Sequence, residues 1–358
     1  MHLAFYIHAM MGGGAERAFA LLASELARQG DKIDLLMDRA TGPNLSLLND
    51  KVRIIDFAGP TWKSAKKLRA YARANKPDLI FAALPHTNLV TAIALLGLPT
   101  PFVATVHSVT GLDHLFWEGG GMLTKGGVLF EPIAFHCAAA IGVVSAAIAK
   151  EKGLEKAYPG KARVLYNPVD VERFKPAPRK PHSGKKIISV GRLAPPKDFQ
   201  TLLRAFALLD AAGDADLTIF GEGPLRPVLE ALSAELGLSR VAMPGYAEDI
   251  AAHYQDADLV VASTRSEGFG NTIIEAWACG VPVVATDCRG APRELLGDAG
   301  AYGALVPVGD APALAQAIER VLANPPKAEV LRARAMDFST EICAGRYRDL
   351  AREIAAKV

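Results

Sequence analysis

Two glutamates, Glu267 and Glu275, bracket a glycine-containing stretch of the sequence, EGFGNTIIE, with seven residues between them. The apolar run Leu259–Ala262 before this stretch is typical of a buried strand, and the residues after Gly270 have the pattern of a helix. Backbone N–H groups at the start of such a helix attract phosphate, and carboxylates accept hydrogen bonds from sugar hydroxyls. The stretch therefore fits a ligand with hydroxyls on both sides of a diphosphate, such as a nucleotide sugar.

A second group of residues, SVGRLAPPK at 189–197, follows the run Lys186–Val190 and holds two cations, Arg192 and Lys197. Gly191 lets the backbone turn, so both cations can reach the end of the preceding strand. Two fixed cations can neutralise a leaving diphosphate without a metal ion. Each site alone has a structural alternative: a capped turn with an exposed second glutamate in the first case, and surface cations near a proline bend in the second.

The sequence predicts that no metal ion is required. An Asp-x-Asp pair that holds a metal would stand at the end of a strand, whereas Asp214 and Asp216 have this spacing but precede theirs. The four cysteines are too far apart for a metal knuckle or a redox motif, and we expect reduced thiols of a cytoplasmic protein. They are Cys137, Cys279, Cys288 and Cys343.

Composition narrows the class of protein. The chain has 358 residues, of which 50% are hydrophobic, and this length favours two domains with sizeable cores. Its 40 basic and 38 acidic residues leave a net charge of +2, which argues against a nucleic-acid partner. The most apolar stretch, Leu89–Val106, is interrupted by Pro99 and Pro101, so we expect no membrane-spanning helix.

The elements that must position these residues alternate between apolar runs and helical patterns, which indicates parallel sheets with crossover helices. We expect two Rossmann-like domains, at 1–170 and 171–344, with a helix at 345–358 completing the first. The helical tail Glu329–Val358 has Ile342, Tyr347, Leu350 and Ile354 at helix-like spacing. The predicted strands are Leu3–Ile7, Lys32–Met37, Arg53–Asp56, Leu79–Ala82, Phe102–Val106, Ala140–Val144, Lys186–Val190, Leu217–Phe220, Val241–Met243, Leu259–Ala262 and Val281–Ala285.

Candidate residues in the first domain also follow predicted strands. Gly12–Gly14 lie between the first strand and the first helix, and Arg17 stands where a dehydrogenase fingerprint would need its third glycine. His107 and His86 each come at the end of a strand, where His107 fits a functional role and His86 an acceptor contact. Glu16 is either an acceptor ligand or a residue that complements the helix dipole. The segment 115–130 combines aromatic residues with glycines, and we expect a loop on the acceptor or membrane side.

Several motifs in this order resemble the retaining glycosyltransferases of family four, which have the GT-B fold. These motifs are GGGAER at 12–17, VGRL with the following lysine at 190–197, FGEGP at 220–224 and EGFGNTIIEAWACGVPVVAT at 267–286. The similarity covers essentially the whole chain. It includes YNPVD at 166–170, where Pro168 replaces the glycine of the family pattern.

The resemblance implies a nucleotide-sugar cleft between two Rossmann-like domains and assigns roles within it. Glu267 would contact the transferred sugar, Glu275 the ribose, and Arg192 with Lys197 the diphosphate, while His107 would hydrogen-bond the donor sugar. The remaining substrate-binding residues would act largely through the backbone: Gly13, Gly14, Gly191, Gly221, Gly245, Tyr246, Gly268, Phe269, Gly270, Asn271 and Thr272.

The implied activity is transfer of a hexose or N-acetylhexosamine, with retention of configuration, from a nucleotide sugar to a glycan or lipid-linked acceptor. A UDP-sugar is the favoured donor, and assembly of lipopolysaccharide, exopolysaccharide or glycolipid is the favoured setting. A UDP-sugar 2-epimerase on the same fold and a sugar-nucleotide-binding protein without catalysis remain alternatives.

One segment, Thr61–Lys76, carries six cations and no acid. As a helix it would turn Trp62, Leu68 and Tyr71, with Ala72, toward the sheet and its cations toward solvent. The cations form either a solvated face or a docking surface for anionic lipid headgroups or an acceptor phosphate. The second interpretation implies a cytoplasmic protein held at the inner face of the cytoplasmic membrane.

Overall fold

The computed structural model describes residues 1–109, 122–178, 182–210, 214–297 and 300–357. These residues form two compact units: unit 1 is Met1–Pro168 with Thr340–Val358, and unit 2 is Val169–Ser339. The predicted domain limits, after residues 170 and 344, lie a few residues from these. Residues 115–121 of the glycine- and aromatic-rich loop expected at 115–130 lie outside the described residues. The loop prediction is wrong for most of the remainder, because Met122–Leu129 form a helix.

Unit 1 is built on a parallel sheet with the strand order β3-β2-β1-β4-β5-β6-β7. Its elements are β1 (His2–Ile7), α1 (Gly14–Arg28), β2 (Lys32–Met37), η1 (Pro43–Leu47), β3 (Arg53–Asp56), α2 (Thr61–Asn75), β4 (Leu79–Ala83), α3 (Pro85–Leu95), β5 (Phe102–Val106), α5 (Met122–Leu129), α6 (Glu131–Cys137), β6 (Ala140–Val143), α7 (Ala146–Glu151), α8 (Leu154–Ala157), β7 (Ala162–Val164) and α16 (Thr340–Ala355).

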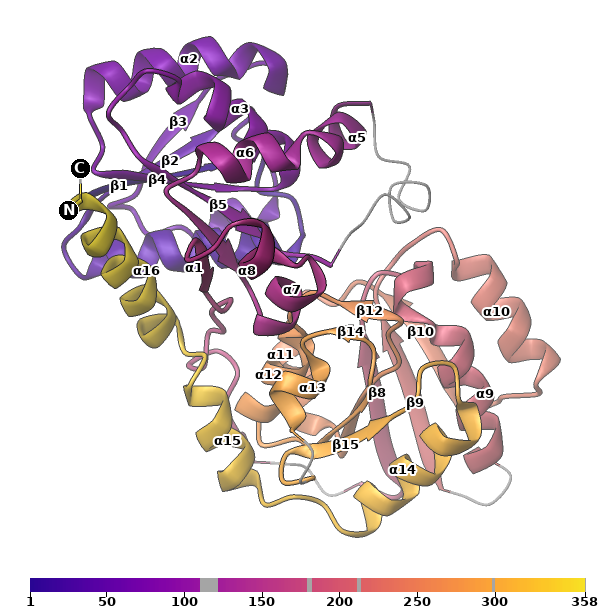
Figure 1. Ribbon diagram of the computed structural model, residues 1–358. Coiled ribbons are helices and arrows are strands. Elements are labelled where there is room, and N and C mark those ends of the chain that lie inside the picture. Colours follow the sequence, from indigo (N-terminus) through magenta and orange to yellow (C-terminus); the bar gives the residue numbers. More distant parts are fainter. Residues whose placement is uncertain (110–121, 179–181, 211–213, 298–299, 358) are drawn as a thin grey trace. The chain divides into compact units, whose positions relative to one another are not determined.

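Helices cover both faces of this sheet, because its central strands are apolar on both sides. All residues of β4, for example, are buried. Helices α1 and α16 lie on one face, whereas α2, α3 and α6 lie on the other (Figure 1). The core beneath α1 and α16 contains Phe5, Phe19 and Phe81.

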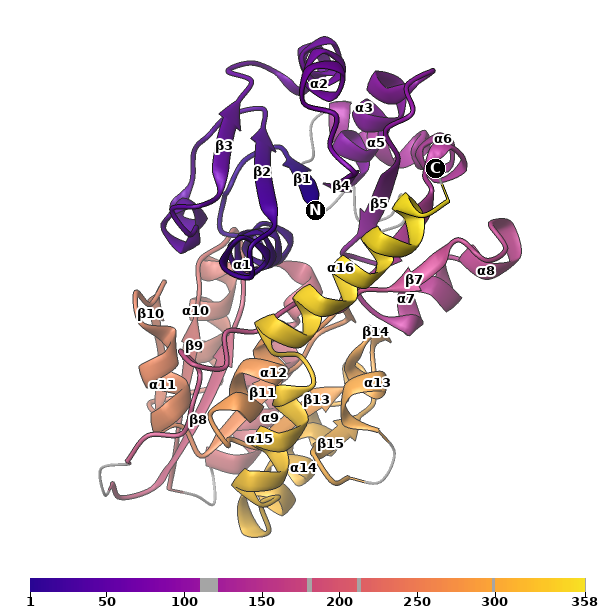
Figure 2. The ribbon, with the colours of Figure 1, turned by 90° about the vertical axis from the view of Figure 1, so that its left-hand side faces the viewer.

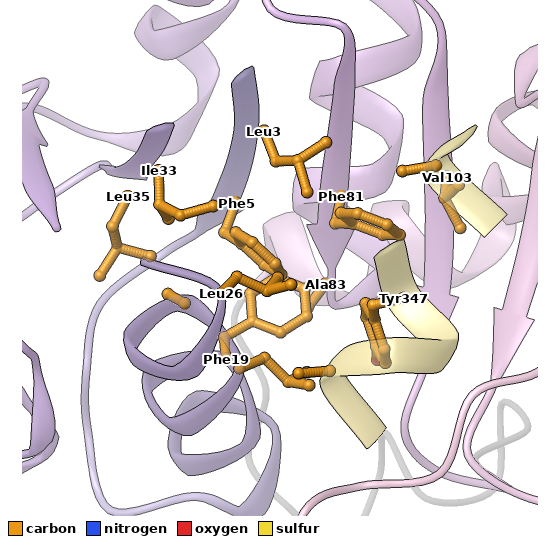
Figure 3. Packing of buried hydrophobic residues seen from close by; sticks show 14 of the residues in the cluster. Leu3, Phe5, Phe19, Leu26, Ile33, Leu35, Phe81, Ala83, Val103 and Tyr347 are labelled. Carbon is orange, nitrogen blue, oxygen red and sulfur yellow. The ribbon is translucent and has the colours of Figure 1, made fainter. Parts of the chain in front are cut away.

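The C-terminal helix α16 belongs to unit 1, where it lies beside α1 (Figure 2). Its Tyr347 is fully buried with its ring centroid 4.9 Å from that of Phe81 and 6.4 Å from that of Phe5 (Figure 3). The predicted tail is helical, but it is divided into two helices, α15 (Ala328–Met336) and α16. The two helices are separated at residues 337–339, where Ser339 pairs with Val169. Ile342, expected on the apolar face, is exposed.

Unit 2 repeats the plan with the strand order β10-β9-β8-β11-β13-β15. Helices α9, α10 and α14 cover one face of this sheet, and α11, α12 and α15 lie on the other (Figure 1). The elements are β8 (Lys185–Val190), η2 (Pro195–Lys197), α9 (Phe199–Asp210), β9 (Ala215–Phe220), α10 (Arg226–Glu235), β10 (Val241–Gly245), α11 (Ile250–Asp256), β11 (Leu259–Ala262), β12 (Ser266–Glu267), α12 (Asn271–Ala278), β13 (Val283–Thr286), β14 (Arg289–Gly290), α13 (Pro292–Leu296), β15 (Gly303–Val306), α14 (Ala311–Ala323) and α15.

Both sheets have a point at which the strand order reverses. In unit 1 this switch point lies between β1 and β4, and in unit 2 it lies between β8 and β11. In open parallel sheets, ligands bind outside the carboxyl ends of the strands at such points. The residues that follow these four strands are therefore the first candidates for function.

Candidate active site

The switch point of unit 2 brings together the predicted cation and carboxylate. Lys197 lies in η2 after β8, and Glu267 lies in β12 after β11. The Nζ atom of Lys197 is 2.5 Å from Oε2 of Glu267, and the two side chains are 24% and 18% exposed. Ser263, directly after β11, donates a hydrogen bond to the carbonyl of Lys197 at 3.0 Å. Residues 70 positions apart thus form one polar group at the carboxyl edge of the sheet.

Glycines bring the loops after β8, β9 and β10 into direct contact. The N–H of Gly221 donates to the carbonyl of Gly245 at 2.8 Å, and the N–H of Gly191 donates to the carbonyl of Phe220 at 2.9 Å. Gly221 has a φ of +138°, and a Cβ atom there would lie 2.0 Å from the carbonyl oxygen of Gly191. A Cβ atom at Gly191 would lie 3.2 Å from the side chain of Lys197. At Gly221 only glycine permits this arrangement.

The loop before α12 is anchored by its aromatic residue. Phe269 is buried and packs edge-on against Phe338, with 5.6 Å between ring centroids. Its side chain is thus part of the core, which leaves its backbone for the ligand contact predicted from the sequence. Gly270 caps α12 with a φ of +95°. Gly268, Asn271 and Thr272 are half-buried around this turn, and their binding roles stay predictions.

Glu275 lies within α12 and is only 4% exposed. The structural alternative of an exposed second glutamate is therefore wrong. Arg192 is exposed, and Tyr246, predicted near the nucleotide base, is exposed as well. The proposed contacts of these three residues with a nucleotide stay predictions.

A buried thiol, Cys288, lies beside this group, 3.3 Å from the hydroxyl of Thr264. Burial is the main cause that raises the pKa of Cys288 to about 11, and the charge of Glu267 acts in the same direction. Cys288 is therefore protonated at neutral pH and is unsuited to act as a nucleophile.

In unit 1, the glycine motif forms the start of α1. Gly13 is the N-cap residue, Gly14 begins the helix, and Glu16 lies in its first turn. The carboxylate of Glu16 folds back so closely that a Cβ atom on Gly13 would lie 2.2 Å from Oε2. Burial raises the pKa of Glu16. Both interpretations of Glu16, dipole partner and acceptor ligand, fit this position.

Both predicted histidines lie at the carboxyl edge of the first sheet. His107 follows β5, with Nε2 2.9 Å from Oγ1 of Thr105 and its ring edge-on to Phe19. His86 lies in the first turn of α3, after β4. Burial is the main cause that lowers the pKa of each to about 4. Both imidazoles are therefore neutral at pH 7 and suit hydrogen bonds to hydroxyls rather than neutralisation of phosphate.

Sequence reasoning missed two residues at this edge, His8 and Asp38. Asp38 is fully buried and accepts hydrogen bonds from Tyr6 at 2.7 Å, Ser64 at 2.5 Å and Thr61 at 2.5 Å. Nδ1 of His8 lies 2.8 Å from Oδ2 of Asp38. Burial alone would raise the pKa of Asp38, but these hydrogen bonds outweigh burial and lower it. The sequence did contain a signal for His8 and Asp38, because each directly follows a predicted strand and therefore lies at the carboxyl edge of the sheet.

The basic segment forms α2, but its faces differ from those predicted. Leu68, Tyr71 and Ala72 are buried as expected, whereas Trp62 is 61% exposed, so the prediction for Trp62 is wrong. The reason is its position in the first turn, where Thr61 and Ser64 face inward to bond Asp38. Lys63 lies over the Trp62 ring, with Nζ 5.0 Å from its centroid, and two further cations are engaged in hydrogen bonds to backbone carbonyls.

The two engaged cations are Lys67 and Arg69. Lys67 donates to the carbonyl of Phe57, and Arg69 donates to the carbonyls of Ala94 and Leu96 at 2.9 and 2.7 Å. Lys63, Lys66, Arg73 and Lys76 are exposed. Among the described helices, none combines the length and apolar composition that crossing a bilayer requires.

Comparison with known families matches both units. Residues 12–173 match the profile of Glycosyltransferase Family 4, and residues 184–324 match that of Glycosyl transferases group 1. The lipopolysaccharide core biosynthesis glycosyltransferase LpsE of Rhizobium meliloti is 34% identical over 168 residues, which are 47% of each chain. The chain thus spans about half the length of the curated relatives that it matches at this level.

Two further similarities extend over nearly the whole chain. A Campylobacter jejuni N-acetylgalactosaminyltransferase that acts on an undecaprenol-diphosphate-linked glycan is 24% identical, covering 90% of this chain and 89% of its own. The Anabaena protein HepE, solved in complex with UDP, superimposes with a TM-score of 0.81 at 21% identity, covering 99% of this chain and 100% of its own. The chain therefore belongs to the family-four glycosyltransferases and has the two Rossmann-like units of the GT-B fold.

Proposed function

We propose that the protein transfers a hexose or N-acetylhexosamine from a nucleotide sugar to a glycan or lipid-linked acceptor, with retention of anomeric configuration. A UDP-sugar is the favoured donor, and the product belongs to a cell-surface polysaccharide or glycolipid. The observation that carries this proposal is the pairing of Lys197 with Glu267 at the switch point of unit 2.

Lys197 and Glu267 are hydrogen-bonded to each other and are suited to two complementary roles. The ammonium of Lys197 is suited to compensate the negative charge that develops on a departing diphosphate. The carboxylate of Glu267 is suited to accept hydrogen bonds from hydroxyls of the transferred sugar, and Lys197 holds it in place. Arg192, exposed beside Gly191, adds a second cation, and the N-terminus of α12 adds a partial positive charge.

The lipid-linked acceptor is supported by what similar proteins are named for. The Campylobacter relative acts on an undecaprenol-diphosphate acceptor, and the Rhizobium relative acts in lipopolysaccharide core biosynthesis. HepE was solved with UDP, which supports the choice of base. We propose that this chain shares the lipid-linked acceptor and the uridine nucleotide of these proteins.

The direct test incubates the protein with UDP-glucose, UDP-galactose, the two UDP-N-acetylhexosamines and GDP-mannose. Each donor is offered with and without a short polyprenyl diphosphate that carries one N-acetylgalactosamine. We expect a glycosylated acceptor with an α-linkage for one donor. A 2-epimer of the donor without transfer would identify an epimerase, and nucleotide binding without any product would identify a binding protein.

We propose further that transfer is independent of metal ions, because Lys197 and Arg192 supply positive charge at the same edge. The described residues contain no group of three or more His, Cys, Asp or Glu side chains that could hold a metal ion. Turnover should persist in excess EDTA. Loss of turnover that returns on addition of Mg²⁺ or Mn²⁺ would contradict this part of the proposal.

We also propose that unit 1 docks on an anionic membrane, at the inner face of the cytoplasmic membrane, through the layer formed by α2, α3, α5 and α6 (Figure 1). Exposed cations on α2 adjoin an exposed Trp62. Leu96, directly after α3, and Leu129, at the end of α5, are exposed as well. Each cation near an anionic surface contributes about 1 kcal/mol at modest salt. Apolar side chains that insert between headgroups add to this attraction.

Liposome flotation tests the docking surface. The wild type should float with vesicles containing a third phosphatidylglycerol at low salt and dissociate at high salt. Lys63→Gln with Lys66→Gln should weaken binding, whereas Lys150→Gln with Lys156→Gln, which removes two exposed cations from α7 and α8, should not. If the wild type stays unbound at both salt concentrations, α2 is a solvated face and a soluble acceptor is favoured.

A further inference from the structure

Polar side chains also gather at the switch point of unit 1, and the donor site proposed in unit 2 does not include them. His8 directly follows β1, and His86 lies in the first turn after β4. These two strands flank the point where the order of the first sheet reverses. The two rings meet edge-on with 5.7 Å between centroids. By the same rule that locates the donor site in unit 2, this edge is a ligand site.

The hydrogen bond to Asp38 determines that Nδ1 of His8 carries a hydrogen. A carboxylate only accepts hydrogen bonds, so the Nδ1 atom of His8, 2.8 Å away, carries a hydrogen. In the neutral imidazole the opposite nitrogen, Nε2, is then a hydrogen-bond acceptor. Asp38 is fully buried, whereas the side chain of His8 is 44% exposed. The buried carboxylate thus orients an exposed ring, as an outer carboxylate does for a metal-binding histidine.

The surroundings of His8 favour a neutral ligand with hydroxyl groups. The buried carboxylate of Asp38 lies directly behind the His8 ring, and its negative charge would repel a phosphate placed against that ring. His86 is neutral at pH 7, and its buried Nδ1 atom has no hydrogen-bond partner among the described residues. A hydroxyl can donate a hydrogen bond to the acceptor nitrogen of His8, which a fully ionised phosphate cannot do.

We propose that His8 binds a hydroxyl group of the glycosyl acceptor through Nε2, and that Asp38 is the positioning residue that fixes the imidazole. This inference rests on the proposed function, which it deepens by naming the residue of unit 1 that recognises the acceptor sugar. The hydrogen bond directs the hydroxyl hydrogen toward Nε2 and leaves the oxygen lone pairs free.

The test compares His8→Phe, His8→Gln and Asp38→Asn with the wild type. The probe acceptor is the polyprenyl diphosphate carrying one N-acetylgalactosamine, and UDP affinity is measured separately by calorimetry. His2→Gln is the matched control, because His2 also pairs with a buried aspartate, Asp34, at 2.7 Å but lies at the opposite edge of the sheet. The tautomer of His8 is read from its imidazole ¹⁵N chemical shifts.

We expect His8→Phe to lower kcat/KM for the acceptor at least tenfold with the Kd for UDP within twofold of the wild type. His8→Gln, whose amide reaches the position of Nε2, should recover part of this loss, and His2→Gln should leave kcat/KM unchanged. Asp38→Asn should convert His8 to the tautomer with hydrogen on Nε2 and lower kcat/KM similarly.

Two results would overturn the inference alone: normal kcat/KM in His8→Phe, or an Nε2–H tautomer in the wild type, while the wild type still transfers sugar. If the wild type neither binds UDP nor glycosylates any acceptor, the proposed function is wrong and this inference is wrong with it. The His8 variants decide the outcome even if Asp38→Asn fails to fold.

Discussion

Replacement of Gly221 by alanine should disturb nucleotide binding through a displacement that can be worked out from the backbone. A Cβ atom at this position would lie 2.0 Å from the carbonyl oxygen of Gly191, whereas real Cβ atoms stay at least 3.0 Å away. The loops after β8 and β9 must therefore separate by about 1 Å. A misplacement of this size lowers the rate of a reaction that depends on precise positioning by on the order of 100-fold. The hydrogen bond from Gly221 to Gly245 is lost or lengthened as well.

Gly237→Ala is the matched control. Gly237 also has a positive φ, +67°, but no atom lies within 4 Å of the position that its Cβ would occupy. It should lose about 1–2 kcal/mol of unfolding free energy from backbone strain alone. Gly221→Ala should lose more, because the steric conflict and the disturbed hydrogen bond add to the strain.

Urea unfolding and calorimetric titration with UDP measure the two effects. We expect the Kd for UDP to rise at least tenfold in Gly221→Ala and to stay within twofold of the wild type in Gly237→Ala. Equal UDP affinity in both variants would refute the reasoning, since it would mean that the contact between these loops does not shape the nucleotide site.

Three further predictions address charge. Arg192→Ala and Lys197→Ala should each lower turnover roughly tenfold or more while the fold persists, because each leaves the departing diphosphate less compensated; steady-state kinetics and circular dichroism check this. Glu275→Ala should mainly raise the Kd for UDP, whereas Glu267→Ala should mainly lower kcat, because ribose contacts exist before the transition state as well as in it. Burial alone would raise the pKa of Asp34, but hydrogen bonds from Arg53, Tyr71 and His2 outweigh it and lower the pKa to about 2. The stability from this depressed pKa is present above pH 4 and lost as the pH falls toward 2, so urea midpoints of the wild type and Asp34→Asn should converge there.

The sequence was sufficient to predict most of both sheets. The predicted strands Lys32–Met37, Arg53–Asp56, Phe102–Val106 and Leu259–Ala262 are confirmed with identical limits. Strand β15 was missed, because its four residues, GALV, begin at a glycine and have too short an apolar run to stand out. Pairing with β13, three residues of which are valine or alanine, makes it a strand.

The grouping of site residues was less predictable than their identity. Glu267 and Lys197 could be chosen from local motifs, but their ion pair depends on the adjacency of β8 and β11, which no local pattern contains. Asp38 needs a similar step, because its partners come from β1 and α2. The prediction for Trp62 failed for the same reason. In the first turn of α2 the side chains that face inward are Thr61 and Ser64, which bond the buried Asp38, and not apolar side chains.

The position of α16 has a consequence for how the chain is made. The first 168 residues leave the ribosome before the helix that covers Phe5 and Phe81 has been synthesised. Unit 2 is translated in the interval, so it can fold as a contiguous segment while unit 1 still exposes an aromatic surface. The nascent first sheet thus needs either rapid completion or protection from aggregation, and an mRNA that stalls ribosomes between codons 169 and 339 should yield chains that bind chaperones through that surface.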